Sequence, residues 1–125
     1  ENFLYLFQFV AETACMVYRV ISTQEFDHQL EELNTVDQER INRFVEQIHQ
    51  NPLVGKPLGF LFLREKKFEG RRMYFLIYDE WHVVLLILLS SKKEQSAAID
   101  WIKKNIPALK EYVRRQLESN DITYR

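Results

Sequence analysis

Residues 60–89 read FLFLREKKFEGRRMYFLIYDEWHVVLLILL, and this stretch decides the fold. It contains three apolar segments rich in aromatic and branched residues, which predict strands over 60–68, 72–78 and 82–89. Glu69-Gly70-Arg71 predicts a tight turn after the first strand, and Asp79-Glu80 a turn after the second. Parallel neighbours need a crossover of about a dozen residues or more, so links this short make the three strands antiparallel. The last strand is apolar from Val83 to Leu89, which favours an inner position covered on both faces.

The residues before this stretch predict one strand and a helical hairpin. Residues 17–21 have the composition of a strand. A capping signal at Ser22 begins a first helix that runs to about Asn34, and a second signal at Thr35 begins another helix. The second helix stops at Asn51-Pro52, because proline disfavours a helical conformation in the residue before it. Residues 51–59 then predict a loop.

The residues after the stretch predict helices. Ser91 and Glu94 form a capping box. The helix that it opens directs Ala98, Trp101 and Ile102 inward, and Pro107 bends or ends it. A final helical stripe is formed by Leu109, Val113 and Leu117.

The order β-α-α-β-β-β-α predicts an α+β fold, with a mainly antiparallel sheet packed by an N-terminal helical hairpin and followed by a C-terminal helical extension. The 125 residues fit one domain, which we place at 17–120, with 121–125 as a tail. Residues 1–16 are rich in Phe and Leu. We interpret them as an upstream extension or the remnant of a protease-tag sequence, and an apolar arm that docks on the domain or on another subunit is the alternative.

Composition narrows the possible functions. The single cysteine, Cys15, excludes an internal disulfide and a cysteine-based zinc site, and it is compatible with a reducing cytosol. The most apolar run is too short to cross a bilayer as a helix. The net charge of −1 predicts no nucleic-acid partner, but 64–72 carries five basic and two acidic residues. We find no metal-ligand spacing and expect no cofactor.

The ordered set of segments resembles the RelE/ParE superfamily of type II toxin–antitoxin systems. The similarity begins with Val17-Tyr18-Arg19-Val20 and continues through Asn51-Pro52 and Gly55-Lys56-Pro57-Leu58, which is similar to an "NP…GKPL" loop of that family. It is strongest over 70–78, GRRMYFLIY, and closes with 83–89 followed by Lys92-Lys93. The resemblance covers about residues 17–100.

The resemblance implies a cytoplasmic toxin that a cognate antitoxin neutralises. RelE-like members cut messenger RNA on the ribosome, so the ribosome and mRNA are implied partners. ParE-like members inhibit DNA gyrase instead. A non-nuclease member, either a gyrase inhibitor or an inactive antitoxin-binding module, is therefore the alternative to an endoribonuclease, and a pure binding module is a third hypothesis. A homodimer, or a heterotetramer with the antitoxin, fits the family. No membrane partner is implied.

The resemblance also suggests which residues carry the chemistry. RelE-like toxins cut RNA without metal, by attack of its own 2′-hydroxyl, using clustered Lys and Arg. Arg72 matches a phosphate-stabilising arginine of the family, and Lys93 matches its second basic position. Lys66 and Lys67 fall near its catalytic lysines, in a register open to a shift of one residue. The predicted catalytic residues are Lys66, Lys67, Arg72 and Lys93, and the predicted RNA contacts are Arg64, Arg71 and Lys92.

Two observations weigh against these assignments. A strand that alternates Lys and Glu is also typical of a solvated or edge position, without any role in chemistry. Ile99 falls where RelE-like enzymes keep a tyrosine that stacks on a base, and Tyr112 is the candidate to replace it.

Overall fold

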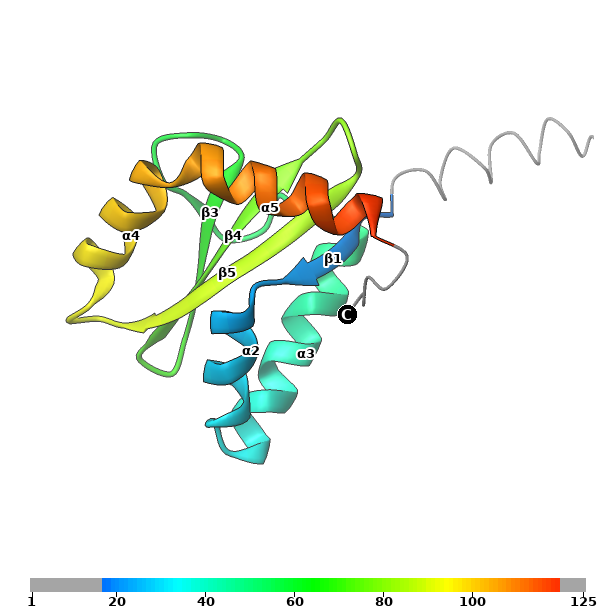
Figure 1. Ribbon diagram of the computed structural model, residues 1–125. Coiled ribbons are helices and arrows are strands. Elements are labelled where there is room, and N and C mark those ends of the chain that lie inside the picture. Colours follow the sequence, from blue (N-terminus) through cyan, green and yellow to red (C-terminus); the bar gives the residue numbers. More distant parts are fainter. Residues whose placement is uncertain (1–16, 120–125) are drawn as a thin grey trace, which may run out of the picture.

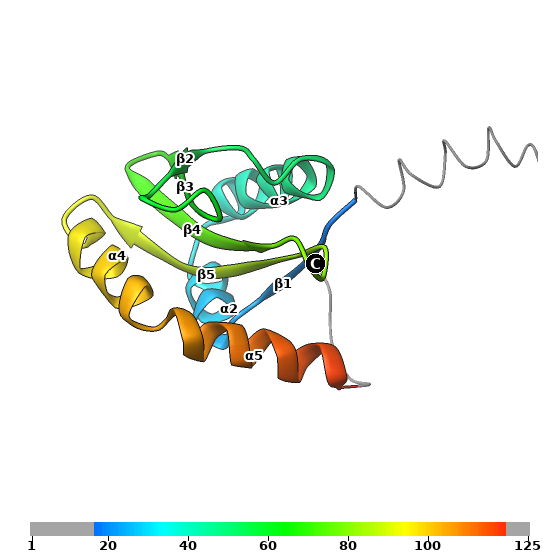
Figure 2. The same ribbon diagram turned by 90° about the horizontal axis from the view of Figure 1, so that it is seen from above.

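The computed structural model describes residues 17–119. Within these residues one five-stranded sheet lies between two layers of helices. Figure 1 labels the elements, and Figure 2 shows α3 on one side of the sheet with α4 and α5 on the other. The strands are β1 (Arg19–Ser22), β2 (Lys56–Pro57), β3 (Leu63–Phe68), β4 (Arg71–Tyr78) and β5 (Val83–Ser91). The helices are α2 (Gln24–Glu31), α3 (Thr35–Gln50), α4 (Gln95–Lys104) and α5 (Ile106–Glu118).

The strand order is β1-β5-β4-β3-β2. The pairs β3–β4, β4–β5 and β2–β3 are antiparallel, whereas β1 pairs with β5 in parallel, with Arg19 opposite Val83. The predicted α+β class is confirmed, and so is the antiparallel pairing of the three strands taken from 60–89. Strand β5 is an inner strand, as its apolar sequence predicted.

Each face of the sheet has its own apolar core. Cluster 1 joins β4 and β5 to α2 and α3, and it includes Phe26, Ile41 and Met73. Cluster 2 joins the opposite face to α4 and α5, and it includes Tyr74, Ile102 and Leu109. The helical hairpin therefore packs on one face, as predicted. The residues predicted to form a helical extension are part of the second core, because their apolar stripe covers the other face.

The starts of α2 and α3 differ from the predicted ones by one residue, and α4 begins at Gln95, after a turn that follows the predicted cap at Ser91. Thr23, and not Ser22, is the N-cap of α2, and its hydroxyl accepts a hydrogen bond from the Phe26 amide at 3.0 Å. Asn34, and not Thr35, is the N-cap of α3, through a bond of 2.8 Å from the Asp37 amide. The reciprocal bonds of the capping box between Ser91 and Glu94 are both present before α4.

Three further predictions were wrong in detail. Residues 60–62 form a turn before β3, and the predicted loop at 51–59 contains the two-residue strand β2. Trp101 was expected in the core but is 48% exposed. The α4 stripe that packs on cluster 2 consists of Ala98, Ile99 and Ile102, and Trp101 lies about 100° around the helix from Ile102.

The predicted N-terminal extension at 1–16 lies outside the described residues, as does the predicted tail at 121–125. Among the described residues, no helix is both long enough and apolar enough to cross a membrane.

Candidate functional site at the basic end of the sheet

The hairpin turn between β3 and β4 sets the register of the predicted catalytic residues. Phe68 pairs with Arg71, so the loop consists of Glu69 and Gly70 alone. Both have positive φ, 45° and 78°, which is the geometry of a type I′ turn. The register that follows places Lys67 directly opposite Arg72. Arg72 in turn lies opposite Ser90 on β5.

Lys67 and Arg72 therefore share the face of the sheet that α4 and α5 cover. Directly opposed residues point to the same face, and Glu65 and Lys67 lie two residues apart on β3. Lys92 and Lys93 are exposed on the turn at 92–94, immediately after Ser91. Figure 1 shows the β3–β4 turn and the β5–α4 turn at the same end of the sheet. The structure thus brings Lys67, Arg72 and Lys93 to one end of the molecule, which we call the basic end.

Arg72 is a buried cation with an internal partner. Its side chain is 8% exposed, and its Nε lies 3.7 Å from Oε2 of Glu65, which is completely buried. The same Glu65 oxygen accepts a hydrogen bond of 2.6 Å from the Gln95 amide, in the first turn of α4. Arg72 also donates from Nη1 to the Gly70 carbonyl at 3.4 Å. Sequence reasoning missed Glu65 and Gln95.

A buried hydroxyl pair lies beside this ion pair. The Tyr74 hydroxyl is 2.8 Å from Oγ of Ser90, and burial raises the pKa of the Tyr74 phenol. The phenol therefore stays neutral at physiological pH and helps to hold β4 and β5 together at the basic end.

Two of the predicted residues lie on the opposite face, with the helical hairpin. Lys66 pairs with Met73 of cluster 1, and its Nζ lies 5.0 Å from the centre of the Phe44 ring. Arg71 donates from Nη1 to Oδ2 of the buried Asp37 at 2.8 Å, which ties the hairpin turn to the start of α3. Lys66 and Arg71 are therefore separated from Arg72 by the sheet itself.

Arg64 has a different position from the one predicted for an RNA contact. It is 6% exposed, and its guanidinium donates to the carbonyls of four residues in the loop before β3. The acceptors, at 2.8 to 3.4 Å, are Val54, Leu61, Gly55 and Leu53. This arginine closes the loop at 53–61 onto the strand, so we do not include it in the candidate site.

The structure also shows where Ile99 and its candidate replacement, Tyr112, lie. Ile99 packs against cluster 2 on the inner side of α4. Tyr112 packs against the same cluster, and its hydroxyl donates to the Ser22 carbonyl at 3.0 Å. Ser22 pairs with Leu86, part-way along β5, so the Tyr112 hydroxyl anchors α5 to β1 and not to the basic end.

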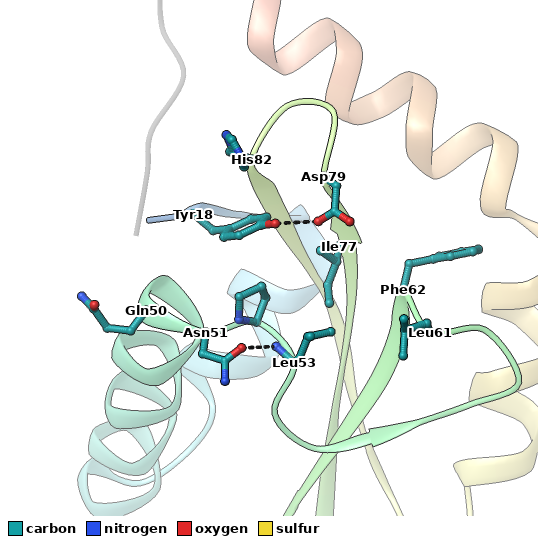
Figure 3. Close-up of a pocket in the computed structure, with 10 residues that line it drawn as sticks. Tyr18, Gln50, Asn51, Leu53, Leu61, Phe62, Ile77, Asp79 and His82 are labelled. Carbon is teal, nitrogen blue, oxygen red and sulfur yellow. Dashed lines mark hydrogen bonds between the residues drawn. The ribbon is translucent and has the colours of Figure 1, made fainter. Parts of the chain in front are cut away.

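Two hollows lie at opposite ends of the sheet. The smaller, of about 260 Å³, borders the basic end and has a mixed lining that includes Arg71, Ser90 and Glu94. The larger, of about 550 Å³, lies at the end where β4 turns into β5. Figure 3 shows Tyr18 and Asp79 on one side of it and Leu61 on the other.

The larger hollow has an apolar character. Leu53 and Leu61 are 54% and 67% exposed at its rim. The Tyr18 hydroxyl donates to Asp79 at 2.5 Å, and burial together with this carboxylate raises the pKa of Tyr18 to about 12. These groups suit an apolar ligand or side chain, whereas the cations that chemistry on a phosphate needs lie at the other end of the sheet.

Comparison with solved structures identifies the fold. A double mutant of the E. coli toxin RelE in the free state superposes with a TM-score of 0.61 and 16% identity, covering 71% of this chain and 98% of that one. The fold is that of the RelE toxins. The toxin–antitoxin complex RelBE2 from Mycobacterium tuberculosis matches the RelE fold of this chain with a TM-score of 0.54 and 24% identity, over 61% of this chain and 99% of that one. The archaeal RelE–RelB complex from Pyrococcus horikoshii matches with a TM-score of 0.54 and 18% identity, covering 62% of this chain and 97% of that one.

No family model matches the sequence, and no curated protein matches it. The RelE fold is thus established for this chain by its structure.

Proposed function

We propose that this protein is the toxin component of a type II toxin–antitoxin module and that it cleaves mRNA at the basic end of the sheet. The observation that carries the proposal is the placement of Lys67 opposite Arg72, at the same end of the sheet as the turn with Lys93. The RelE fold and the antitoxin complexes among its structural neighbours support the same function. A cognate antitoxin is the expected partner, with the ribosome and mRNA as further partners in the cytoplasm.

The proposed reaction needs no metal. The 2′-hydroxyl of the RNA loses a proton and attacks the adjacent phosphorus, and the 5′-oxygen leaves with a proton. The products are a 2′,3′-cyclic phosphate and a 5′-hydroxyl. Negative charge builds on the phosphate during attack, and we assign its stabilisation to Arg72, because a guanidinium can bond two phosphate oxygens. We assign Lys67 and Lys93 to the same phosphate and its leaving oxygen, and Lys92 to the neighbouring RNA backbone.

Two adjacent lysines provide a matched test. Lys67 shares the face of Arg72, whereas Lys66 lies on the opposite face beside Phe44. After induction in cells, sequencing of RNA ends should show that Lys67→Gln lowers cleavage by about 100-fold, the usual effect of removing one group that stabilises transition-state charge. Lys66→Gln should cleave as the wild type does. Equal effects of the two variants, or intact transcripts during growth arrest, would contradict the proposal.

A second function, that of a non-nuclease member, is favoured by two specific observations. The guanidinium that should bind phosphate already faces the buried carboxylate of Glu65. Ile99 packs against cluster 2 at the position where RelE-like enzymes keep a tyrosine that stacks on a base. A gyrase supercoiling assay separates the alternatives, since a gyrase inhibitor would trap cleaved DNA complexes while transcripts stay intact. An inactive antitoxin-binding module would give neither product.

A further inference from the structure

Glu65 occupies the position that an anionic ligand of Arg72 would take. It is 1% exposed on β3, opposite Tyr74, and Oε2 is its atom nearest to Arg72. A carboxylate buried this deeply is costly unless a cation or several hydrogen bonds compensate its charge. The only cation that the described residues place in an ion pair with Glu65 is Arg72.

The contact between these two groups is loose. The separation of 3.7 Å between Arg72 Nε and Glu65 Oε2 is an ion pair but exceeds hydrogen-bonding distance. Within residues 17–119, Arg72 Nε and the second oxygen of Glu65, Oε1, have no hydrogen-bond partner. A charge-assisted bond between a guanidinium and an oxyanion is normally about 2.7–2.9 Å long. Arg72 thus keeps a buried donor that a better-placed oxyanion would satisfy.

Gln95 fixes Glu65 in this arrangement. Its side-chain amide donates to Oε2 at 2.6 Å, and Gln95 is the first residue of α4. The same carboxylate oxygen is therefore shared between the helix and the arginine. Displacement of the carboxylate from Arg72 would require this bond to break or to rotate.

We propose that Glu65 is an internal competitor for Arg72, held in place by Gln95, and that a nucleic-acid phosphate must displace it to bind. The ligand class is a phosphodiester oxyanion, and its assignment to RNA rests on the function proposed above. Removal of the Glu65 charge therefore opens an oxyanion site at Arg72, and loss of the Gln95 bond weakens the competitor without removing it.

The first test measures thermal unfolding with inorganic phosphate, against chloride at the same ionic strength. Phosphate should raise the Tm of Glu65→Gln by about 3 °C or more, since a ligand that binds only the folded state stabilises it. Three controls should show less than half of that shift: the wild type, the double variant Glu65→Gln/Arg72→Gln, and Glu80→Gln. The last of these alters an exposed ion pair with Lys110. An equal shift in all four proteins would overturn the proposal.

A second variant keeps the test decisive if Glu65→Gln does not fold. Gln95→Ala retains every charge, and Gln95 is only partly buried. Binding of a fluorescent single-stranded RNA 12-mer should tighten by about threefold, and the slope of log affinity against log salt should steepen by about one as a further phosphate contact forms. Unchanged affinity and slope would overturn the proposal.

The same measurement with a DNA 12-mer of matching sequence distinguishes the source of the phosphate. Tightening with both oligomers supports a general backbone site, and tightening with RNA alone supports an RNA site. Neither binding assay depends on cleavage. A phosphate-stabilised Glu65→Gln variant that leaves transcripts intact would therefore retain this inference and reject only the nuclease function.

Discussion

Lys66 and Lys67 show how one step along a strand changes the role that a residue can have. Successive side chains of a strand point to opposite faces, so only one of the two lysines can face Arg72. The two-residue turn at Glu69 and Gly70 selects Lys67. Lys66 instead covers the Phe44 ring on the helical-hairpin side.

Arg64 provides a prediction at the residue scale. Its guanidinium is buried and donates to four loop carbonyls, so Arg64→Met should lower the free energy of unfolding by about 3 kcal/mol, because the charge-assisted bonds are lost and buried acceptors remain. Urea unfolding measures the loss. Arg43→Met, at an exposed position of α3, is the control and should change stability by no more than about 0.5 kcal/mol. Similar losses in both variants would contradict the structural role of Arg64.

The sequence predicted which side chains gather at the basic end better than it predicted their partners. Arg72 and Lys93 follow from strand order alone, since the turns after β3 and β5 must lie at one end. The position of Glu65 on the same face could also have been predicted, because Glu65 lies two residues before Lys67 on the strand. The hydrogen bond from Gln95 to Glu65 could not have been predicted, because it depends on how α4 docks on the sheet, and no local pattern in the sequence specifies that position.

At the scale of elements, two glycines with the same backbone conformation offer a matched prediction. Gly55 and Gly70 both have φ of 78°. An added Cβ at Gly70 meets no atom within 4 Å, whereas one at Gly55 would overlap the carbonyl oxygen of Glu65. Gly70→Ala should therefore lower the free energy of unfolding by about 1 kcal/mol from backbone strain alone. Gly55→Ala should cost about 2 kcal/mol more, because the backbone of β3 must also move.

Urea unfolding of the two alanine variants makes the comparison. Equal losses would show that the loop at 51–59 shifts away from β3 without cost, which would contradict the close packing seen there.

Local sequence signals, such as capping residues and prolines, predict most of the helices and strands, and they also explain the small errors in the predicted boundaries. Proline at 107 separates α4 from α5 as expected, since its position near the start of α5 suits a residue without an amide hydrogen. The misplaced N-caps, Ser22 and Thr35, each lie beside a residue with the same capping ability. Which of two such neighbours accepts the amide hydrogen depends on the entry angle of the chain. Strand β2 could not be foreseen, because two residues carry no periodic pattern.

At the scale of the whole molecule, one sheet is shared by two apolar cores. Ile41 belongs to cluster 1 and Leu109 to cluster 2. Ile41→Ala and Leu109→Ala should each lower the stability of the entire domain by about 3 kcal/mol, because loss of either core exposes the sheet.

The two tryptophans make cooperativity measurable. Trp81 packs against cluster 2 and Trp101 lies on α4, so fluorescence reports the α4/α5 side, whereas far-ultraviolet circular dichroism reports all helices. The two urea transitions should coincide in the wild type and in both variants. An Ile41→Ala variant whose dichroism transition shifts while its fluorescence transition does not would show that the two cores unfold separately.

The parallel pairing of β1 with β5 has a consequence for biosynthesis. The ribosome makes β1 before the other described strands, yet its only strand partner in the described chain follows the hairpin of β3 and β4. During translation the helical hairpin can form early, but Val20 and Ile21 have no strand to pair with until Val83 to Leu86 have left the exit tunnel. The nascent chain therefore completes its sheet late, and the interval before β5 emerges is when a chaperone or a partner chain has access to that unpaired edge.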